Sequence, residues 1–107
     1  MPETKSGFPY FEVQFDKDGN VHDAAEVQAV LDFVAGDTTD LFVFSHGWNN
    51  DMDEARNLYQ RLLAHFRAEL DAGRVAGVAG RKLAVLGVLW PSKKFAEKDL
   101  IASGAAS

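Results

Sequence analysis

One short apolar run, residues 41–44, constrains the fold of this chain more than any other feature. It follows Asp40 and stops at Ser45, and His46-Gly47 comes next. A continuous apolar run of this length is typical of a strand buried on both faces, as in a parallel sheet covered by helices. His46 and Gly47 are then predicted at the carboxyl end of the strand, where open α/β sheets bind ligands. Gly47 allows a sharp turn and a close approach of substrate to the backbone.

The segments after this run predict a βαβ unit. A capping-box pattern at Asp51 and Glu54 precedes apolar residues at helical spacing, which predicts a helix over residues 52–72. A second apolar run, residues 83–90, follows the helix. Because such a unit is almost always a right-handed crossover, we expect residues 41–45 and 83–90 to be parallel strands of one sheet. Both strands would then end on the same edge, with the helix packed on one face.

Two further elements are expected before this unit. Residues 8–15 are rich in aromatic and β-branched residues, and Phe11, Val13 and Phe15 alternate with two polar residues, which is typical of a half-buried strand. Asp23, with Glu26 three residues later, predicts a capped helix over residues 23–35. The apolar face of that helix is expected to carry Val27, Val30, Leu31 and Val34. On the helix over 52–72, a polar face predicted to lie in solvent carries Arg56, Gln60, Arg61, Arg67 and Glu69.

Composition bounds the class of protein. The chain has 107 residues, which suits one small domain, and 47% of them are hydrophobic, which argues against disorder. A net charge of −5 without a basic stripe argues against nucleic acid as a partner. The absence of cysteine excludes disulfides, thiolate catalysis and cysteine-ligated zinc. Neither a secretory signal nor an apolar run long enough to span a membrane is present, so a cytoplasmic location is expected.

Candidate metal ligands are weak in this sequence. His22 precedes a helix start and is expected at the surface or in a cap, and His65 is expected on a helix flank. No zinc-binding histidine pattern occurs. The acidic turn at residues 16–20 has its glycine at the wrong position for an EF-hand loop. We therefore expect no metal and no cofactor.

The strand that ends in His46-Gly47, with a helix soon after it, resembles the oxyanion-hole segment of the α/β-hydrolase superfamily. In that family the residue after the H-G pair donates a backbone N–H to the developing oxyanion. The resemblance implies that Trp48 is this donor and that His46, Gly47 and Asn49 shape the loop. Because both strands are expected to end on one edge, Trp48 and Trp90 are expected to line one cleft, with Asn49 beside them. A plain strand-to-helix turn, with the tryptophan side chains capping the core, is the alternative.

A serine hydrolase also needs a nucleophile, and the family presents it in a G-x-S-x-G-like elbow. This chain has no such motif, and Ser45 and His46 are neighbours on an extended segment, so their side chains point in opposite directions. No catalytic residue is therefore expected in this chain. The resemblance implies a partial α/β-hydrolase-like sheet, mostly parallel and flanked by helices. It departs from many family members in the helix over 23–35, where their link is shorter.

The expected organisation is a flexible leader over residues 1–7, the N-terminal part of an α/β-hydrolase-like domain over 8–95, and a flexible or incomplete segment over 96–107. The leading hypothesis is an N-terminal fragment of a serine hydrolase that acts on an ester or other acyl substrate and is inactive alone. A small self-contained, non-catalytic α/β binding module is the alternative. Nucleotide binding is disfavoured because no glycine-rich phosphate motif occurs. In the family, the H-G strand also pairs with the strand leading into the elbow, so the isolated chain is expected to self-associate through that edge.

Overall fold

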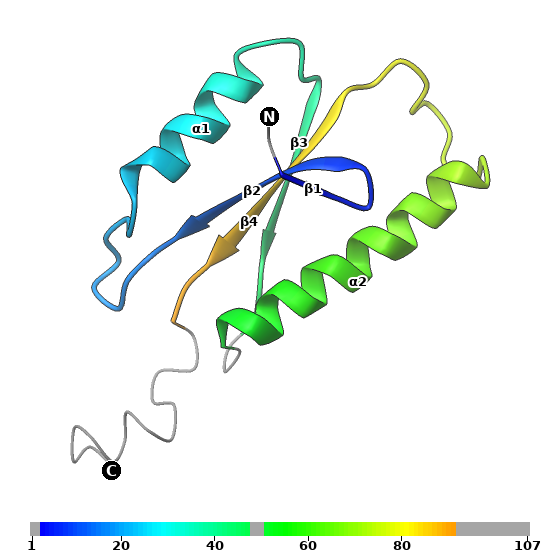
Figure 1. Cartoon of the computed structure of the whole chain (residues 1–107). Helices are drawn as coiled ribbons and strands as arrows, with labels where there is room; N and C mark the ends of the chain where they lie inside the picture. Colours follow the sequence, from blue (N-terminus) through cyan, green and yellow to red (C-terminus); the bar gives the residue numbers. More distant parts are fainter. Residues whose placement is uncertain (1–2, 48–50, 92–107) are drawn as a thin grey trace.

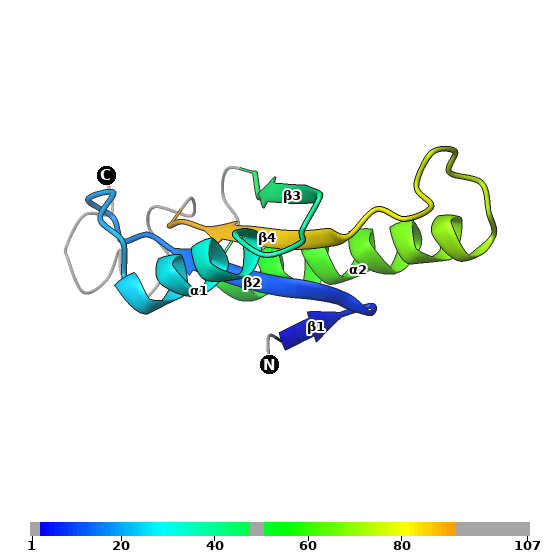
Figure 2. The same ribbon diagram turned by 90° about the horizontal axis from the view of Figure 1, so that it is seen from above.

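A mixed sheet forms the centre of the molecule in this computed structural model, which describes residues 3–47 and 51–91. The elements are β1 (Glu3–Lys5), β2 (Phe8–Gln14), α1 (Ala24–Val34), β3 (Asp40–Ser45), α2 (Met52–Asp71) and β4 (Leu83–Leu89). Among these residues the four strands follow the order β1-β2-β4-β3, so β1 and β3 lie at the two edges (Figure 2). The chain therefore has an α/β arrangement.

The predicted βαβ unit is present. β3 and β4 are parallel neighbours, with Phe42 opposite Val85 and Phe44 opposite Gly87. β2 is parallel to β4 on its other side, whereas β1 pairs with β2 in the antiparallel sense. Within the expected leader over residues 1–7, Glu3–Lys5 form an edge strand. The segment over 96–107 lies outside the described residues.

The two helices cover opposite faces of the sheet (Figure 1). Phe11 of β2 packs against Phe33 of α1, with the ring centroids 5.1 Å apart. Its neighbour Tyr10 is buried and belongs to the same apolar cluster as Leu63 of α2. Because successive side chains of a strand point to opposite faces, β2 is sandwiched between α1 and α2. The predicted half-buried strand is therefore covered on both sides.

The core lies mainly between α2 and the sheet. It consists of two clusters of buried side chains. The first contains Phe8, Tyr10, Leu63 and Val85. The second contains Ala55, Tyr59 and Leu89. β4 is the central strand of this core, and its residues are buried or half-buried along the whole strand. The side chains of β4 are thus buried or half-buried on both faces of the sheet.

Gly87 lies where two tyrosines cross the middle of β4. A Cβ atom added to Gly87 would lie 2.5 Å from Tyr10 Oη and 3.1 Å from Tyr59 Cδ2. Glycine inside a strand often marks such a close approach. The small residue at this position therefore lets both aromatic rings reach the face of the sheet beneath α2.

The apolar run of β3 is not buried on both faces, which corrects the prediction from its composition. Phe42 and Phe44 face α2 and are half-buried. Leu41 and Val43 point to the other face and are 37% and 56% exposed. α1 lies over β2 at the far side of that face, so among the described residues nothing covers these two side chains. β3 is an edge strand with apolar side chains on both faces.

The start of α1 also differs from the expected capping box. The side chain of Asp23 caps the helix by accepting a hydrogen bond from the N–H of Ala25. Glu26 does not return a bond to the cap but accepts one at 3.1 Å from the backbone N–H of Gln14 in β2. The glutamate therefore links α1 to the sheet. Leu31, predicted on the buried face of this helix, is exposed, whereas Val30 is buried.

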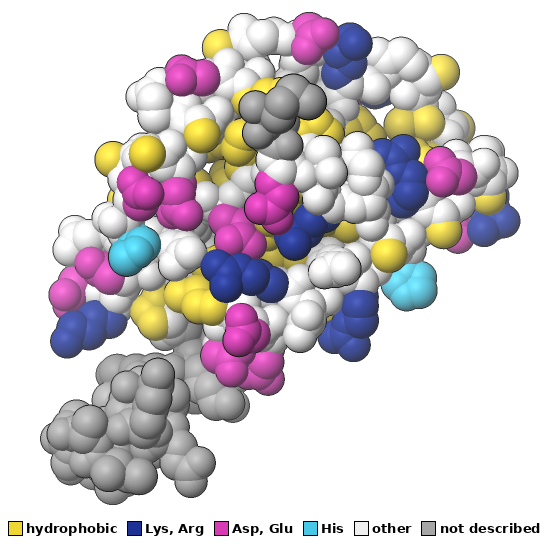
Figure 3. Space-filling view, in the orientation of Figure 1, with side chains coloured by type: hydrophobic (Ala, Val, Ile, Leu, Met, Phe, Trp, Pro, Cys, Tyr) yellow, Lys and Arg dark blue, Asp and Glu magenta, His cyan; other side chains and the backbone are white. Residues whose placement is uncertain are grey.

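Acidic and basic side chains are interspersed over the face seen in Figure 3, with apolar surface between them. Within the described residues, no helix combines the length and the apolar character that crossing a membrane requires.

Candidate functional site

His46 and Gly47 lie at the carboxyl end of β3, on the edge of the sheet where β4 also ends. Ser45 is exposed there, whereas His46 is only 3% exposed. The two side chains therefore point to opposite sides, as the sequence predicts, and do not form a nucleophile–base pair. His46 is the buried polar residue of the described core.

Hydrogen bonds determine the tautomer of His46. Its Nε2 atom lies 3.1 Å from the backbone nitrogen of Trp90, whose N–H can only donate. Nε2 must therefore carry a lone pair, and the ring proton resides on Nδ1. Nδ1 lies 3.0 Å from the carbonyl oxygen of Gly47, to which it donates. The imidazole is thus neutral in this arrangement and joins the ends of β3 and β4.

Trp90 contributes its ring as well as its backbone to this junction. The imidazole of His46 stacks on the Trp90 ring, with the centroids 5.1 Å apart and the planes 12° apart. Trp90 is half-buried, just beyond the end of β4. The sequence places Trp90 beside the H-G turn, and the structure brings them into contact.

Tyr59 of α2 ties the same two strand ends together from the helix side. Its hydroxyl donates a 2.6 Å hydrogen bond to the carbonyl oxygen of Val88 and is hydrogen-bonded to the backbone of His46. Burial raises the pKa of Tyr59, and the hydrogen bond from His46 partly offsets that effect. The hydroxyl therefore stays protonated and serves as a fixed bridge at neutral pH.

The start of α2, which follows residues 48–50 in the chain, is also fixed by hydrogen bonds. The side chain of Asp51 accepts a hydrogen bond from the N–H of Glu54 at 2.8 Å, and the Glu54 carboxylate accepts one from the N–H of Asp51 at 3.0 Å. This is the capping box that the sequence predicts. The segment between His46 and Asp51 is thus anchored at both ends.

The structure places only part of the predicted oxyanion segment. Gly47 follows the buried His46 and is exposed. Trp48, the expected N–H donor, and Asn49, the expected cleft residue, lie outside the described residues. Tyr59 was missed as a site residue, because its place in the apolar stripe of α2 indicates only core packing. A polar atom on a buried aromatic residue requires a partner, and that requirement is the signal for Tyr59.

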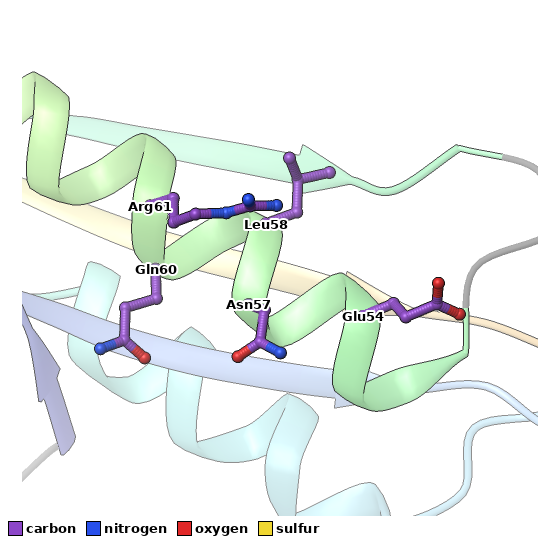
Figure 4. Close-up of a pocket in the computed structure, with 5 residues that line it drawn as sticks. All are labelled: Glu54, Asn57, Leu58, Gln60 and Arg61. Atoms are coloured by element: carbon purple, nitrogen blue, oxygen red, sulfur yellow. The ribbon is translucent and has the colours of Figure 1, made fainter.

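Surface hollows occur elsewhere on the molecule. One, about 540 Å³, is bounded by side chains of α2 (Figure 4): Glu54, Asn57, Leu58, Gln60 and Arg61. Another, about 310 Å³, lies beside β3 and is lined by Phe42, Phe44, Leu62 and Phe66. The second hollow is apolar and lies on the α2 side of β3, opposite the face that carries the exposed Leu41 and Val43.

Among the described residues, no group of three or more histidine, aspartate or glutamate side chains is arranged to hold a metal ion. No protein-family model matches the chain, and neither a curated protein nor a solved structure matches it.

Proposed function

We propose that this chain supplies the oxyanion-hole part of a serine hydrolase that acts on an ester or other acyl substrate. The observation that carries the proposal is the anchored turn at His46-Gly47, where two parallel strands end. A loop with fixed ends is a suitable support for a backbone donor, because a preorganised N–H stabilises an oxyanion without reorganising. Trp48 supplies that donor in this proposal, and Trp90 borders the same turn.

The nucleophile, the base and the orienting acid belong, in this proposal, to a part of the hydrolase that this chain does not contain. The edge of β3 supports that division. In the α/β-hydrolase topology, the strand leading into the nucleophile elbow pairs with the H-G strand. Here β3 has apolar side chains on both faces, and Val43 is more than half exposed. An added parallel strand with its helix would bury this surface.

The proposal is tested with fluorophosphonate labelling and with short p-nitrophenyl esters. The chain alone is expected to give no stoichiometric serine labelling and no hydrolysis above a histidine background. A longer chain that continues through a G-x-S-x-G strand is expected to show both. If the short chain is labelled at a serine, or if the coding sequence ends in a stop codon at this point, the proposal is wrong and a self-contained binding module is the better account.

Loss of the donor is tested in the active longer chain. Trp48→Pro removes the backbone N–H and is expected to lower kcat by roughly 10²–10³-fold, which is typical for one oxyanion donor. Trp48→Phe keeps the N–H and serves as the matched control, with kcat close to that of the parent. Equal losses in the two variants would assign the effect to the side chain and not to the donor.

A further inference from the structure

Glu12 and Arg56 form a two-pronged ion pair beneath the start of α2. Arg56 Nε lies 3.1 Å from both Glu12 oxygens, and Arg56 Nη2 lies 3.0 Å from Oε1. The hydroxyl of Tyr10 donates a further bond to Glu12 Oε2 at 2.9 Å. The side chains of Glu12 and Arg56 are 18% and 36% exposed. Arg56 therefore does not lie on a fully solvated helix face, which corrects the prediction from its spacing.

The ion pair joins β2 to α2 near the end of the sheet that carries the site. Glu12 lies opposite Gly87 of β4, and Gly87 lies opposite Phe44 of β3, two residues before His46. Arg56 is in the second turn of α2, shortly after the cap at Asp51. The pair thus fixes the beginning of α2 to β2, the parallel strand farthest from β3.

Arg56 also has a second acidic neighbour, Asp53, but the contact with Glu12 is the stronger one. Asp53, on the helix itself, lies 3.8 Å from Arg56 and is exposed, so it contributes a weaker, solvent-screened contact. By contrast, the bidentate fork of Arg56 constrains both the distance and the orientation of the helix relative to Glu12. In the first two turns of α2, Ala55 is buried as well, but it provides only non-directional packing.

We infer that Glu12 and Arg56 are positioning residues for the H-G turn. His46 anchors the beginning of the loop to β4, and the ion pair anchors its end by holding the first turns of α2 against β2. The role in catalysis rests on the proposed oxyanion function of this segment. The structural role, which is to hold the first turns of α2 against β2, rests only on the contacts between Glu12 and Arg56 and is tested without substrate.

The test is hydrogen exchange of individual backbone amides in Glu12→Gln, a variant that keeps the size and the acceptor oxygen. The amides of Asp51, Glu54 and Ala55, at the helix start, are expected to exchange about tenfold faster, because local opening no longer breaks an ion pair. The amides of Leu63 and Val85, in the core, are expected to change little. Glu69→Gln, which removes the exposed ion pair with Arg74, is the matched control and should leave the helix start unchanged.

A second variant separates charge from geometry. Arg56→Lys keeps the positive charge but loses the fork, and it is expected to speed exchange at the same amides. Uniform acceleration at all amides would show a general loss of stability, and no acceleration at the helix start would show that the pair positions nothing. Either result overturns the inference.

Activity gives an independent readout in the longer chain that carries the nucleophile. There, Glu12→Gln is expected to lower kcat with little change in KM, since the oxyanion donor acts in the transition state. If that longer chain is inactive even with Glu12 intact, the proposed function is wrong. The hydrogen-exchange experiment would still test whether the ion pair holds the start of α2, because it needs no activity.

Discussion

The Nε2 atom of His46 accepts a hydrogen bond from the backbone N–H of Trp90, at 3.1 Å. This contact makes the side chain of His46 a link between two parallel strands at the point where their own ladder ends. The histidine of the H-G pair thus has a structural task that is distinct from proton transfer. It holds a turn whose backbone is the functional part in the proposed hydrolase.

The first prediction concerns the tautomer of His46. Nitrogen-15 NMR of the imidazole rings at neutral pH is expected to show His46 protonated at Nδ1 and unprotonated at Nε2, because Trp90 donates to Nε2. The exposed residues His22 and His65 provide internal references in the same spectrum. Observation of the Nε2–H tautomer for His46 would contradict the assignment.

A second prediction concerns the glycine in the centre of β4. Gly87→Ala is expected to destabilise the fold by about 1–3 kcal/mol, because its Cβ would meet Tyr10 Oη at 2.5 Å. Urea unfolding measures the loss. The double variant Gly87→Ala/Tyr10→Phe should recover part of it, since removal of the hydroxyl opens the space. Strictly additive effects of the two substitutions would show that the clash is not the cause.

The third prediction is a loss of stability in alkaline solution. Burial, and then the hydrogen bond to Glu12, raise the pKa of Tyr10 above its usual value. The folded chain therefore keeps a proton that the unfolded chain loses near pH 10, so the stabilisation is complete below about pH 10 and is lost as the pH rises further. Each such tyrosine steepens the decline by up to about 1.4 kcal/mol per pH unit.

Tyr10→Phe tests this effect by urea unfolding near pH 9 and near pH 11. The variant lacks the titrating group, so its stability should fall less between the two pH values than that of the parent. Equal declines would assign the alkaline sensitivity to other groups. The buried hydroxyl of Tyr59, whose pKa burial also raises, would then be the next residue to replace.

The fourth prediction concerns self-association through β3. Sedimentation of the chain at several concentrations is expected to show association, since residues 41–44 of this edge are apolar and lack charge and proline. Because Val43 is 56% exposed, Val43→Lys places the new charge in solvent and should not unfold the chain. A lysine on an edge strand disfavours pairing with a second chain, so the variant should associate less than the parent.

Leu31→Lys is the matched control for that experiment. Leu31 is also an exposed apolar residue, but it lies on α1 and not on the edge strand. The Leu31→Lys variant should therefore leave the self-association of the chain unchanged. If the parent chain stays monomeric and folds cooperatively at high concentration, the view that β3 lacks a neighbour loses its main support.

The order and type of the elements could be predicted because local patterns determine them. The apolar runs of β3 and β4, the helical spacing of α2 and the cap at Asp51 each act within a few residues. β1 escaped prediction because three polar residues owe their strand conformation to pairing with β2. Composition also could not distinguish β4, which is buried or half-buried along its whole length, from β3, which has two exposed apolar side chains. That difference depends on which neighbours are present.

For the site, the sequence predicted the position of His46-Gly47 and of Trp90 at one edge of the sheet. It did not reveal their hydrogen bonds, because His46 and Trp90 are far apart in the chain and meet only after the strands have aligned. Arg56 was assigned to solvent for a related reason. Its partner Glu12 lies on a different strand, and helical spacing carries no information about that strand.

The central place of β4 has a consequence for how the chain folds during synthesis. Both parallel pairings of the sheet, with β2 and with β3, require β4, and β4 is the last of the described strands to leave the ribosome. Until then β2 and β3 have no parallel partner, and only α1, α2 and the β1–β2 hairpin can form from local contacts. Pairings between distant segments slow folding and prolong the exposure of apolar strands. The nascent chain therefore carries the uncovered run of β3 for the time that it takes to make α2 and β4.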